Sequence, residues 1–121
     1  MLRSIIIDDE FRSRNILQHL LEKYCANIEL VAVVDSAHAG KIAVEKFHPQ
    51  IVFLDIEMPE QNGFDFLASY DTTEFQTIAV TAHSEYRTKV HQYNAAAFLL
   101  KPIDIDELKT AIVVAEERIV A

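Results

Sequence analysis

Five short apolar runs separated by amphipathic stretches constrain this sequence more than any other feature. The runs are expected to be strands, at 4–8, 28–34, 51–55, 76–82 and 96–100. After each of them, apolar side chains recur every three or four residues, which predicts helices at 11–24, 37–47, 63–70, 84–94 and 105–120. Continuous apolar strands that alternate with helices are typical of a parallel sheet covered on both faces.

The order of these elements predicts an α/β fold with a five-stranded sheet. Crossovers between parallel strands are right-handed, and five strands alternating with five helices are typical of the flavodoxin-like (βα)5 fold. We therefore expect a doubly wound parallel sheet in the order 2-1-3-4-5. The chain has 121 residues, which suits a single domain over 1–121, and no internal repeat or linker divides it.

Two of the predicted helices have apolar faces that can be checked residue by residue. In the helix at 37–47, the residues at helical spacing are Ala39, Ile42, Ala43 and Phe47. In the helix at 105–120, they are Leu108, Ala111, Ile112, Ala115 and Ile119. We expect these faces to cover the sheet.

The charge and composition of the chain exclude several classes of function. The 19 acidic and 11 basic residues give a formal net charge of −8, which repels phosphate backbones and argues against direct binding of nucleic acid. The apolar runs fall far short of the roughly 20 residues that a membrane span needs. The start, MLRSIIIDDE, runs directly into three acids, unlike a signal peptide. The single cysteine excludes an internal disulfide framework. A cytoplasmic protein is expected.

Polar and charged residues follow the predicted strands at the end where such sheets bind ligands. Asp8 ends the first strand and Asp9 follows it, and Asp55 ends the third. Thr81 ends the fourth strand, and Lys101 follows the fifth. In the order 2-1-3-4-5 the first and third strands are neighbours at the switch in strand order, where ligands bind. The three carboxylates should therefore crowd one spot, flanked by Lys101 and Thr81.

Three carboxylates that lie so close repel one another and raise each other's pKa. One lysine offsets about one of these charges, and a divalent cation would offset two more. Oxygen ligands at a partly open site suit Mg²⁺, which is usually held by one or two protein carboxylates together with a phosphate. The sequence therefore predicts a magnesium site that includes Asp55.

These motifs, taken together and in order, resemble a response-regulator receiver domain of two-component signalling. The resemblance rests on the Asp8-Asp9 pair, on Asp55 with the stretch DIEMPEQNGFDFL, on Thr81, and on Lys101-Pro102. It covers the whole chain. It implies a phosphorylation-controlled signalling switch and a single receiver domain over 1–121, either standing alone or cut from a longer regulator with a C-terminal output domain.

The resemblance implies a role for each matching residue at the acidic cluster. Asp55 would accept a phosphoryl group from the phosphohistidine of a sensor histidine kinase or of a phosphotransfer protein. Mg²⁺, or Mn²⁺ in its place, would be bound by Asp9 directly, by Asp8 through water, and by Asp55 itself. The main-chain carbonyl of Glu57 would complete the protein ligands.

The resemblance also implies how the phosphoryl group would be held and sensed. Lys101 would pair with Asp55 and then with the phosphoryl oxygens, and the Lys101-Pro102 peptide bond would be cis. Thr81 would hydrogen-bond a phosphoryl oxygen. Thr81 and Phe98 would form the switch, with the Phe98 ring rotating inward as Thr81 moves towards the phosphoryl group.

Glu57 and His83 each lie two residues beyond a site residue, Asp55 and Thr81 respectively. Both should overhang the phosphoryl group. We hypothesise that Glu57 repels phosphate and that His83 affects the attack of water, so that both set the lifetime of the phosphoryl group. The alternative is that both side chains are merely solvated.

The partners implied by the resemblance dock on the surface formed by 84–94, 96–100 and 105–120. They are the output domain of the full-length protein or a second copy of the chain in a homodimer. The stretch DIEMPEQNGFDFL, together with VTAHSEYRTKVHQYNAAAFLLKPID, looks most like receivers that precede LytTR-type DNA-binding domains. Transcriptional regulation through such a domain is the implied process.

Three other functions remain open on the residues alone. A small Mg²⁺-dependent phosphatase with an aspartyl-phosphate intermediate needs a second acid two residues after its nucleophile, where this chain has Glu57 instead of the usual Asp. A flavodoxin needs a hydroxyl-rich phosphate loop, where Asp8-Asp9-Glu10 would repel phosphate. A receiver-like binding module would not need the complete set of strand-end residues. We expect a phosphoacceptor that assists only its own phosphorylation and dephosphorylation, and not an enzyme.

Overall fold

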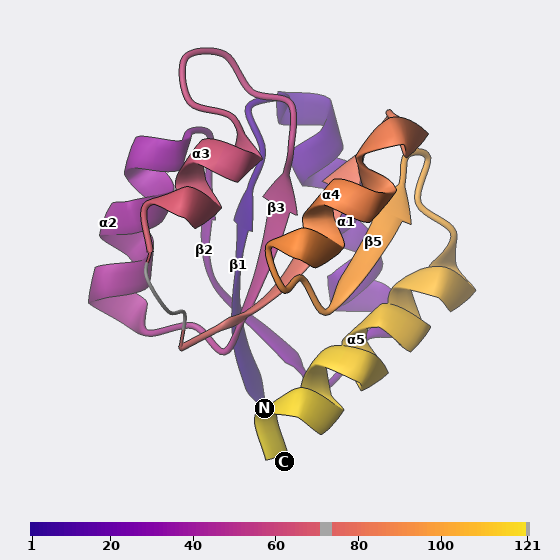
Figure 1. Cartoon of the computed structure of the whole chain (residues 1–121). Helices are drawn as coiled ribbons and strands as arrows, with labels where there is room; N and C mark the ends of the chain where they lie inside the picture. The colour runs from indigo at the N-terminus through magenta and orange to yellow at the C-terminus, as the bar shows by residue number, and fades with distance from the viewer. Residues whose placement is uncertain (71–73, 121) are drawn as a thin grey trace.

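A five-stranded parallel sheet forms the centre of the protein (Figure 1). The computed structural model describes residues 1–70 and 74–120. The strands are β1 (Leu2–Ile7), β2 (Ile28–Val34), β3 (Ile51–Asp55), β4 (Gln76–Thr81) and β5 (Ala97–Leu100). Every neighbouring pair is parallel, and the order is β2-β1-β3-β4-β5. The predicted fold class and strand order are confirmed.

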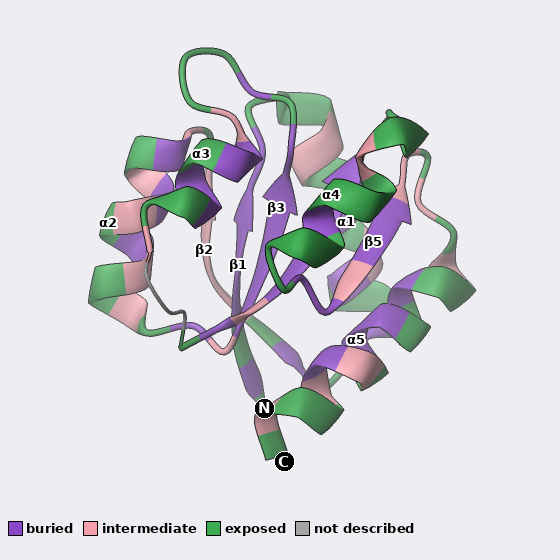
Figure 2. Cartoon of the chain, viewed as in Figure 1, coloured by how far each residue is buried: buried purple, intermediate pink, exposed green. Residues whose placement is uncertain are grey.

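Helices cover both faces of the sheet. They are α1 (Phe11–Tyr24), α2 (Ala37–Phe47), α3 (Gly63–Ala68), α4 (Arg87–Gln92) and α5 (Ile105–Val120). One apolar layer joins α1 and α5 to the sheet, and a second joins α2, α3 and α4 to its other face. β3, β4 and most of β1 are buried, the edge strand β2 is mostly half-buried, and the exposed residues lie on the outer sides of the helices and in the loops (Figure 2). Among the described residues, no helix has the length and apolarity that crossing a membrane requires.

The segment after β4 differs from the predicted helix at 84–94. It begins with a 3₁₀ turn, η1 (Ser84–Tyr86), and α4 extends only over Arg87–Gln92. Val90 is the one buried residue of α4. A longer amphipathic helix needs more apolar positions on one face to be held against the sheet, so the chain adopts the shorter arrangement.

The face that α2 turns to the sheet also differs from the prediction. Ala37, Gly40 and Ala43 are buried, whereas Ile42 is 55% exposed, so the prediction for Ile42 was wrong. Gly40 supplies the reason, because a Cβ at this position would collide with the Ile7 side chain. The helix therefore approaches β1 along its smallest residue. The face of α5 agrees with the prediction, with four of its members buried: Leu108, Ala111, Ile112 and Ala115.

Gly63 places the start of α3 directly against the end of β3. Its N–H donates to the carbonyl of Ile56 at 2.9 Å, and Asn62 caps the helix through the N–H of Asp65. A Cβ on Gly63 would lie 2.8 Å from the carbonyl oxygen of Asp55 and 2.9 Å from the Cα of Ile56. The loop after Asp55 can therefore follow its path only with glycine at this position.

We expect Gly63→Ala to destabilise the protein by about 1–3 kcal/mol, because backbone atoms of β3 would have to move. Gly40→Ala is the matched control, since its Cβ would displace the end of a side chain, and alanine favours the helix by about 1 kcal/mol. Urea unfolding of both variants gives the two free energies of unfolding. A larger loss for Gly40→Ala would contradict this account of the loop.

Candidate functional site

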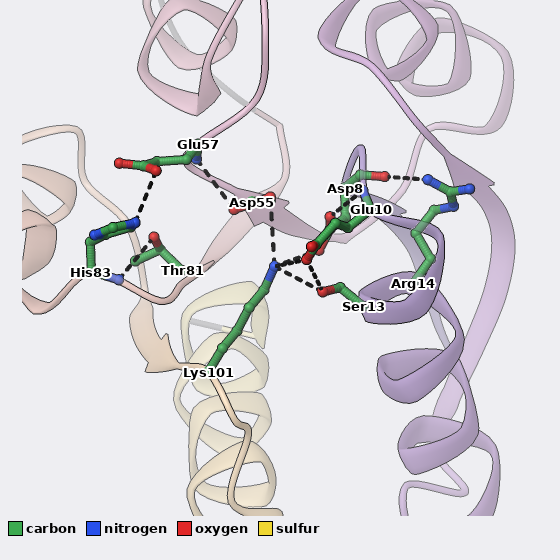
Figure 3. A network of polar contacts seen from close by, with 9 residues as sticks. All are labelled: Asp8, Glu10, Ser13, Arg14, Asp55, Glu57, Thr81, His83 and Lys101. Atoms are coloured by element: carbon green, nitrogen blue, oxygen red, sulfur yellow. Dashed lines mark hydrogen bonds and ion pairs between the residues drawn. The ribbon is translucent and has the colours of Figure 1, made fainter.

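The carboxyl ends of four strands bring the predicted site residues to one place. Asp8 follows β1, Asp55 ends β3, Thr81 ends β4 and Lys101 follows β5. Figure 3 shows the Lys101 ammonium group reaching between the carboxylates of Asp8 and Asp55. Single carboxylate oxygens of Asp8, Asp9 and Asp55 lie within 4.8 Å of one another. This crowding follows from the strand order, because β1 and β3 are neighbours.

Lys101 makes most of the charged contacts in the cluster. Its Nζ lies 3.0 Å from Oδ2 of Asp8, 3.6 Å from Oδ2 of Asp55 and 3.9 Å from Oε1 of Glu10. It also donates a hydrogen bond of 3.2 Å to Oγ of Ser13. Burial lowers the pKa of Lys101, but Asp55 and Asp8 outweigh that effect, so its pKa lies above the usual value. The ammonium group therefore stays charged.

Asp55 is the most strongly perturbed carboxyl group of the site. Burial raises its pKa to about 7, and the charge of Asp8 acts in the same direction. Lys101 and a hydrogen bond of 3.2 Å from the N–H of Glu57 to Oδ1 of Asp55 oppose this shift only in part. One lysine is thus too little positive charge for these carboxylates, as the sequence predicted.

The loop after β1 is held by contacts that sequence analysis did not predict. The N–H of Glu10 donates to Oδ1 of Asp8 at 2.9 Å, and the guanidinium of Arg14 donates to the Asp8 carbonyl at 2.8 Å. Ser13 joins Glu10 through a hydrogen bond of 2.7 Å. Ser13 and Arg14 lie in the first turn of α1, directly after the acidic loop. This position in the sequence could have identified them as residues of the site.

A second set of contacts extends from Asp55 towards η1. The two carboxylate oxygens of Glu57 contact different partners: Oε2 lies 3.0 Å from Nε2 of His83, and Oε1 accepts a hydrogen bond of 2.7 Å from the Tyr86 hydroxyl. The bond to Glu57 raises the pKa of Tyr86. Glu57 and His83 both line the pocket over Asp55, as the sequence analysis expected. It missed Tyr86, which is 29 residues away from Glu57.

The predicted switch residues lie on the side of the sheet that faces α4. Thr81 is fully buried, and its Oγ1 accepts a hydrogen bond of 3.3 Å from the N–H of His83. The Phe98 ring is 8% exposed and is covered by the guanidinium of Arg87, 4.6 Å from the ring centroid. The Lys101-Pro102 peptide bond is cis.

The donor set of the site fits a hard divalent cation. An open pocket of about 270 Å³ lies over the cluster, and its lining includes Asp9, Asp55, Glu57 and Lys101. The converging groups are carboxylates, which Mg²⁺ and similar ions prefer over nitrogen or sulfur ligands. A cation here would lower the pKa of Asp55, because a nearby positive charge favours the ionised carboxylate.

Comparison with known proteins assigns the chain to a family. Residues 5–113 match the sequence pattern of the response regulator receiver domain. The chain belongs to this family. Receiver domains are the phosphorylation-controlled switches of two-component response regulators, they bind Mg²⁺ at an acidic pocket, and they interact with histidine kinases and output domains.

Similar proteins are consistent with membership of the receiver family. A response regulatory protein of Vibrio cholerae is 35% identical over 109 residues, which are 89% of this chain and 46% of that protein. The transcriptional regulatory protein BtsR of Escherichia coli is 36% identical over 105 residues, which are 86% of this chain and 44% of BtsR. The receiver chain described here thus spans less than half the length of these relatives.

A solved structure shows the same fold. The crystal structure of a DNA-binding response regulator of the LuxR family from Staphylococcus aureus has a TM-score of 0.84 and 27% sequence identity. The match covers 95% of this chain and 98% of that chain.

The raised pKa of Asp55 predicts how stability depends on pH. An aspartate in an unfolded chain has a pKa of about 4, so between about pH 4 and pH 7 the folded receiver holds a proton that the unfolded chain has released. The contribution of Asp55 to the stability of the folded receiver therefore falls as the pH rises through this window. In EDTA at pH 8, we expect Asp55→Asn to be more stable than wild type by about 2–4 kcal/mol.

Urea unfolding at pH 4.5, 6 and 8 measures this difference, which should shrink towards pH 4.5. Mg²⁺ should narrow the difference at pH 8, because it binds the folded wild type. Asp35→Asn, at an exposed aspartate, is the control and should change stability little at any pH. Equal stabilities of wild type and Asp55→Asn at pH 8 would contradict the claim that the ionised Asp55 carboxylate destabilises the folded protein.

Proposed function

We propose that Asp55 is the phosphoacceptor of this receiver. One observation carries the proposal: Asp55 is a buried carboxylate at the end of β3 that opens into the pocket and has the Lys101 ammonium group 3.6 Å away. The donor would be the phosphohistidine of a sensor histidine kinase or of a phosphotransfer protein.

The reaction is a transfer of one phosphoryl group to Asp55. A carboxylate oxygen of Asp55 forms a bond to phosphorus, the bond from phosphorus to the histidine nitrogen breaks, and its electron pair stays on the imidazole. Such transfers depend on position and on neutralisation of the phosphoryl oxygens more than on covalent chemistry by the protein. Lys101 supplies one positive charge, and Thr81 supplies a hydroxyl that can donate to a phosphoryl oxygen.

Asp8, Asp9 and Asp55, with the main-chain carbonyl of Glu57, would hold Mg²⁺ or Mn²⁺ at the pocket. The support is the convergence of the three carboxylates and the hard oxygen character of the donor set. When bound, the cation supplies positive charge for the phosphoryl oxygens. Asp8 is held in place by Lys101 and Glu10, so the site needs little rearrangement.

We infer that the chain assists only its own phosphorylation and dephosphorylation and is not an enzyme for other substrates. A phosphatase of the aspartyl-phosphate class needs a second acid two residues after the nucleophile, directed at the reacting group. In this receiver that residue is Glu57, whose carboxylate is bound to Tyr86 and His83. This arrangement favours the signalling function over the phosphatase.

The switch would involve Thr81 and Phe98 and would act on the surface of α4, β5 and α5. A groove of about 400 Å³ lies there, between Arg87 and Phe98 on one side and Asp106 and Val114 on the other. Charges of both signs at its edges suit a second copy or an output domain. We propose a homodimer through this surface, which sedimentation velocity of the phosphorylated protein tests.

We propose that the full-length protein controls transcription in the cytoplasm through a LytTR-type DNA-binding domain after the receiver. The support is the resemblance in the stretches around Asp55 and from Val80 to Asp104. The chain also spans less than half of its curated relatives, and one of these is named a transcriptional regulatory protein. The coding sequence beyond Ala121 tests this proposal, and an output domain of another type would contradict it.

Intact mass after incubation with acetyl phosphate tests the phosphoacceptor. We expect an adduct of about 80 Da in wild type with Mg²⁺, stable in acid and labile in base as an acyl phosphate is. We expect no adduct in EDTA, and none in Asp55→Asn. Asp65→Asn is the control, because Asp65 lies ten residues further along, in α3, and should leave the adduct unchanged.

Two results would contradict the proposal. An adduct of equal yield in Asp55→Asn would move the phosphoacceptor to another residue. No adduct in wild type under any condition would make the chain a binding module with a receiver fold, and the roles of Lys101 and Thr81 would fall with it.

A further inference from the structure

Glu57 joins the Asp55 loop to the segment before α4. Its N–H donates to Oδ1 of Asp55 at 3.2 Å, while its two carboxylate oxygens contact His83 and Tyr86, both outside β3 and its loop. Figure 3 shows Glu57 reaching away from Asp55 towards His83. One residue therefore contacts the phosphoacceptor through its backbone and the η1 region through its side chain.

Tyr86 passes this contact on to α3 and α4. It is the last residue of η1 and directly precedes α4. Its ring packs edge-on against Phe64 of α3, with 5.5 Å between ring centroids. The Tyr86 hydroxyl fixes the start of α4 to Glu57, and the ring fixes it to α3.

The apolar contacts of α4 alone are few. Val90 is its one buried residue, and the helix is six residues long, which is too short for a stable helix without tertiary support. The contacts of Glu57 with Tyr86 and His83 add to the packing of Arg87 on Phe98 and of Lys89 on Phe64 at this end of α4. A change at Glu57 should alter the position or the opening of α4.

We propose that the Glu57 carboxylate is a clasp that holds η1 and α4 in place while Asp55 is unmodified, and that a phosphoryl group on Asp55 opens it. This inference rests on the proposed function of Asp55. An aspartyl phosphate carries close to two negative charges where the Asp55 carboxylate carries one, next to a residue whose N–H contacts Asp55 directly. Repulsion between this charge and the Glu57 carboxylate weakens the contacts of that carboxylate with Tyr86 and His83.

A second contact would also weaken the hold of Glu57 on η1 and α4 after phosphorylation. The N–H of His83 donates to Oγ1 of Thr81 in the unmodified receiver. If a phosphoryl group draws the Thr81 side chain towards it, Oγ1 moves away from this N–H, and His83 is one of the two partners of Glu57. Two effects therefore weaken the contacts of the Glu57 carboxylate. The charge on Asp55 repels the carboxylate itself, and movement of Thr81 displaces its partner His83.

Hydrogen exchange of the backbone amides in Ser84–Gln92 tests the clasp in the unmodified protein. Tyr86→Phe removes the hydroxyl and keeps the ring on Phe64. We expect exchange about 2- to 10-fold faster than in wild type, the range for the loss of one hydrogen bond. Tyr93→Phe is the matched control: Tyr93 also packs on Phe64, at 5.2 Å, and among the described residues its hydroxyl has no hydrogen-bond partner.

The opening step is tested on the same amides after reaction with acetyl phosphate and Mg²⁺, with the adduct counted by intact mass. We expect wild type to approach the exchange rate of Tyr86→Phe, and Tyr86→Phe to change little. Glu57→Gln keeps an oxygen that accepts from Tyr86 but carries no charge, so we expect it to respond to phosphorylation less than wild type. A purely structural contact would not give this difference in response.

The results separate the clasp from the proposed function. Equal exchange in unmodified wild type and Tyr86→Phe overturns the clasp, whatever happens at Asp55. An adduct on wild type without faster exchange overturns the opening step. If wild type forms no adduct, the proposed function and the opening step both fail, while the unmodified comparison still decides whether the Tyr86 hydroxyl holds α4.

Discussion

The site of this receiver depends on an incomplete balance of buried charge. Asp8 and Asp55 are both buried and approach the same Lys101 ammonium group, at 3.0 and 3.6 Å. Burial and the nearby charge of Asp8 make Asp55 hard to ionise, and Lys101 offsets this only in part, so the pKa of Asp55 is about 7. Positive charge added at the pocket would favour the ionised form of Asp55. The carboxylates of the site are thus suited to a further cation.

The sheet makes this unfavourable arrangement possible. Ile7 and Leu54, just before the two acids, are completely buried, and β1 and β3 are paired along their length. Helices on both faces enclose these strands, so the carboxyl ends cannot move apart to relieve the repulsion without breaking the core. The stability of two apolar layers therefore holds the carboxylates together, and function is concentrated at the one edge where the strands end.

The sequence was sufficient for the fold and for the charged centre, but not for the surroundings of that centre. The strand order follows from alternation and from the handedness of crossovers, and it brings Asp8, Asp55 and Lys101 together without further information. The contact of Glu57 with Tyr86 depends on how the chain turns after β4. There the few apolar positions gave a 3₁₀ turn where a helix was predicted. Ile42 was misplaced for a similar reason, because packing at Gly40 overrode side-chain spacing.

The residues that could be predicted from the sequence and those that could not have different physical roles. The residues proposed to meet a phosphoryl group lie at strand ends that the core holds in place. Residues that report the modification must be able to move, so they lie where packing is sparse, as in α4 with its single buried Val90. Glu57 links these two groups of residues. Its backbone belongs to the loop after β3, and its side chain binds the weakly packed segment before α4. Under the proposal for Glu57, a charge change at Asp55 acts on α4 through the Glu57 side chain.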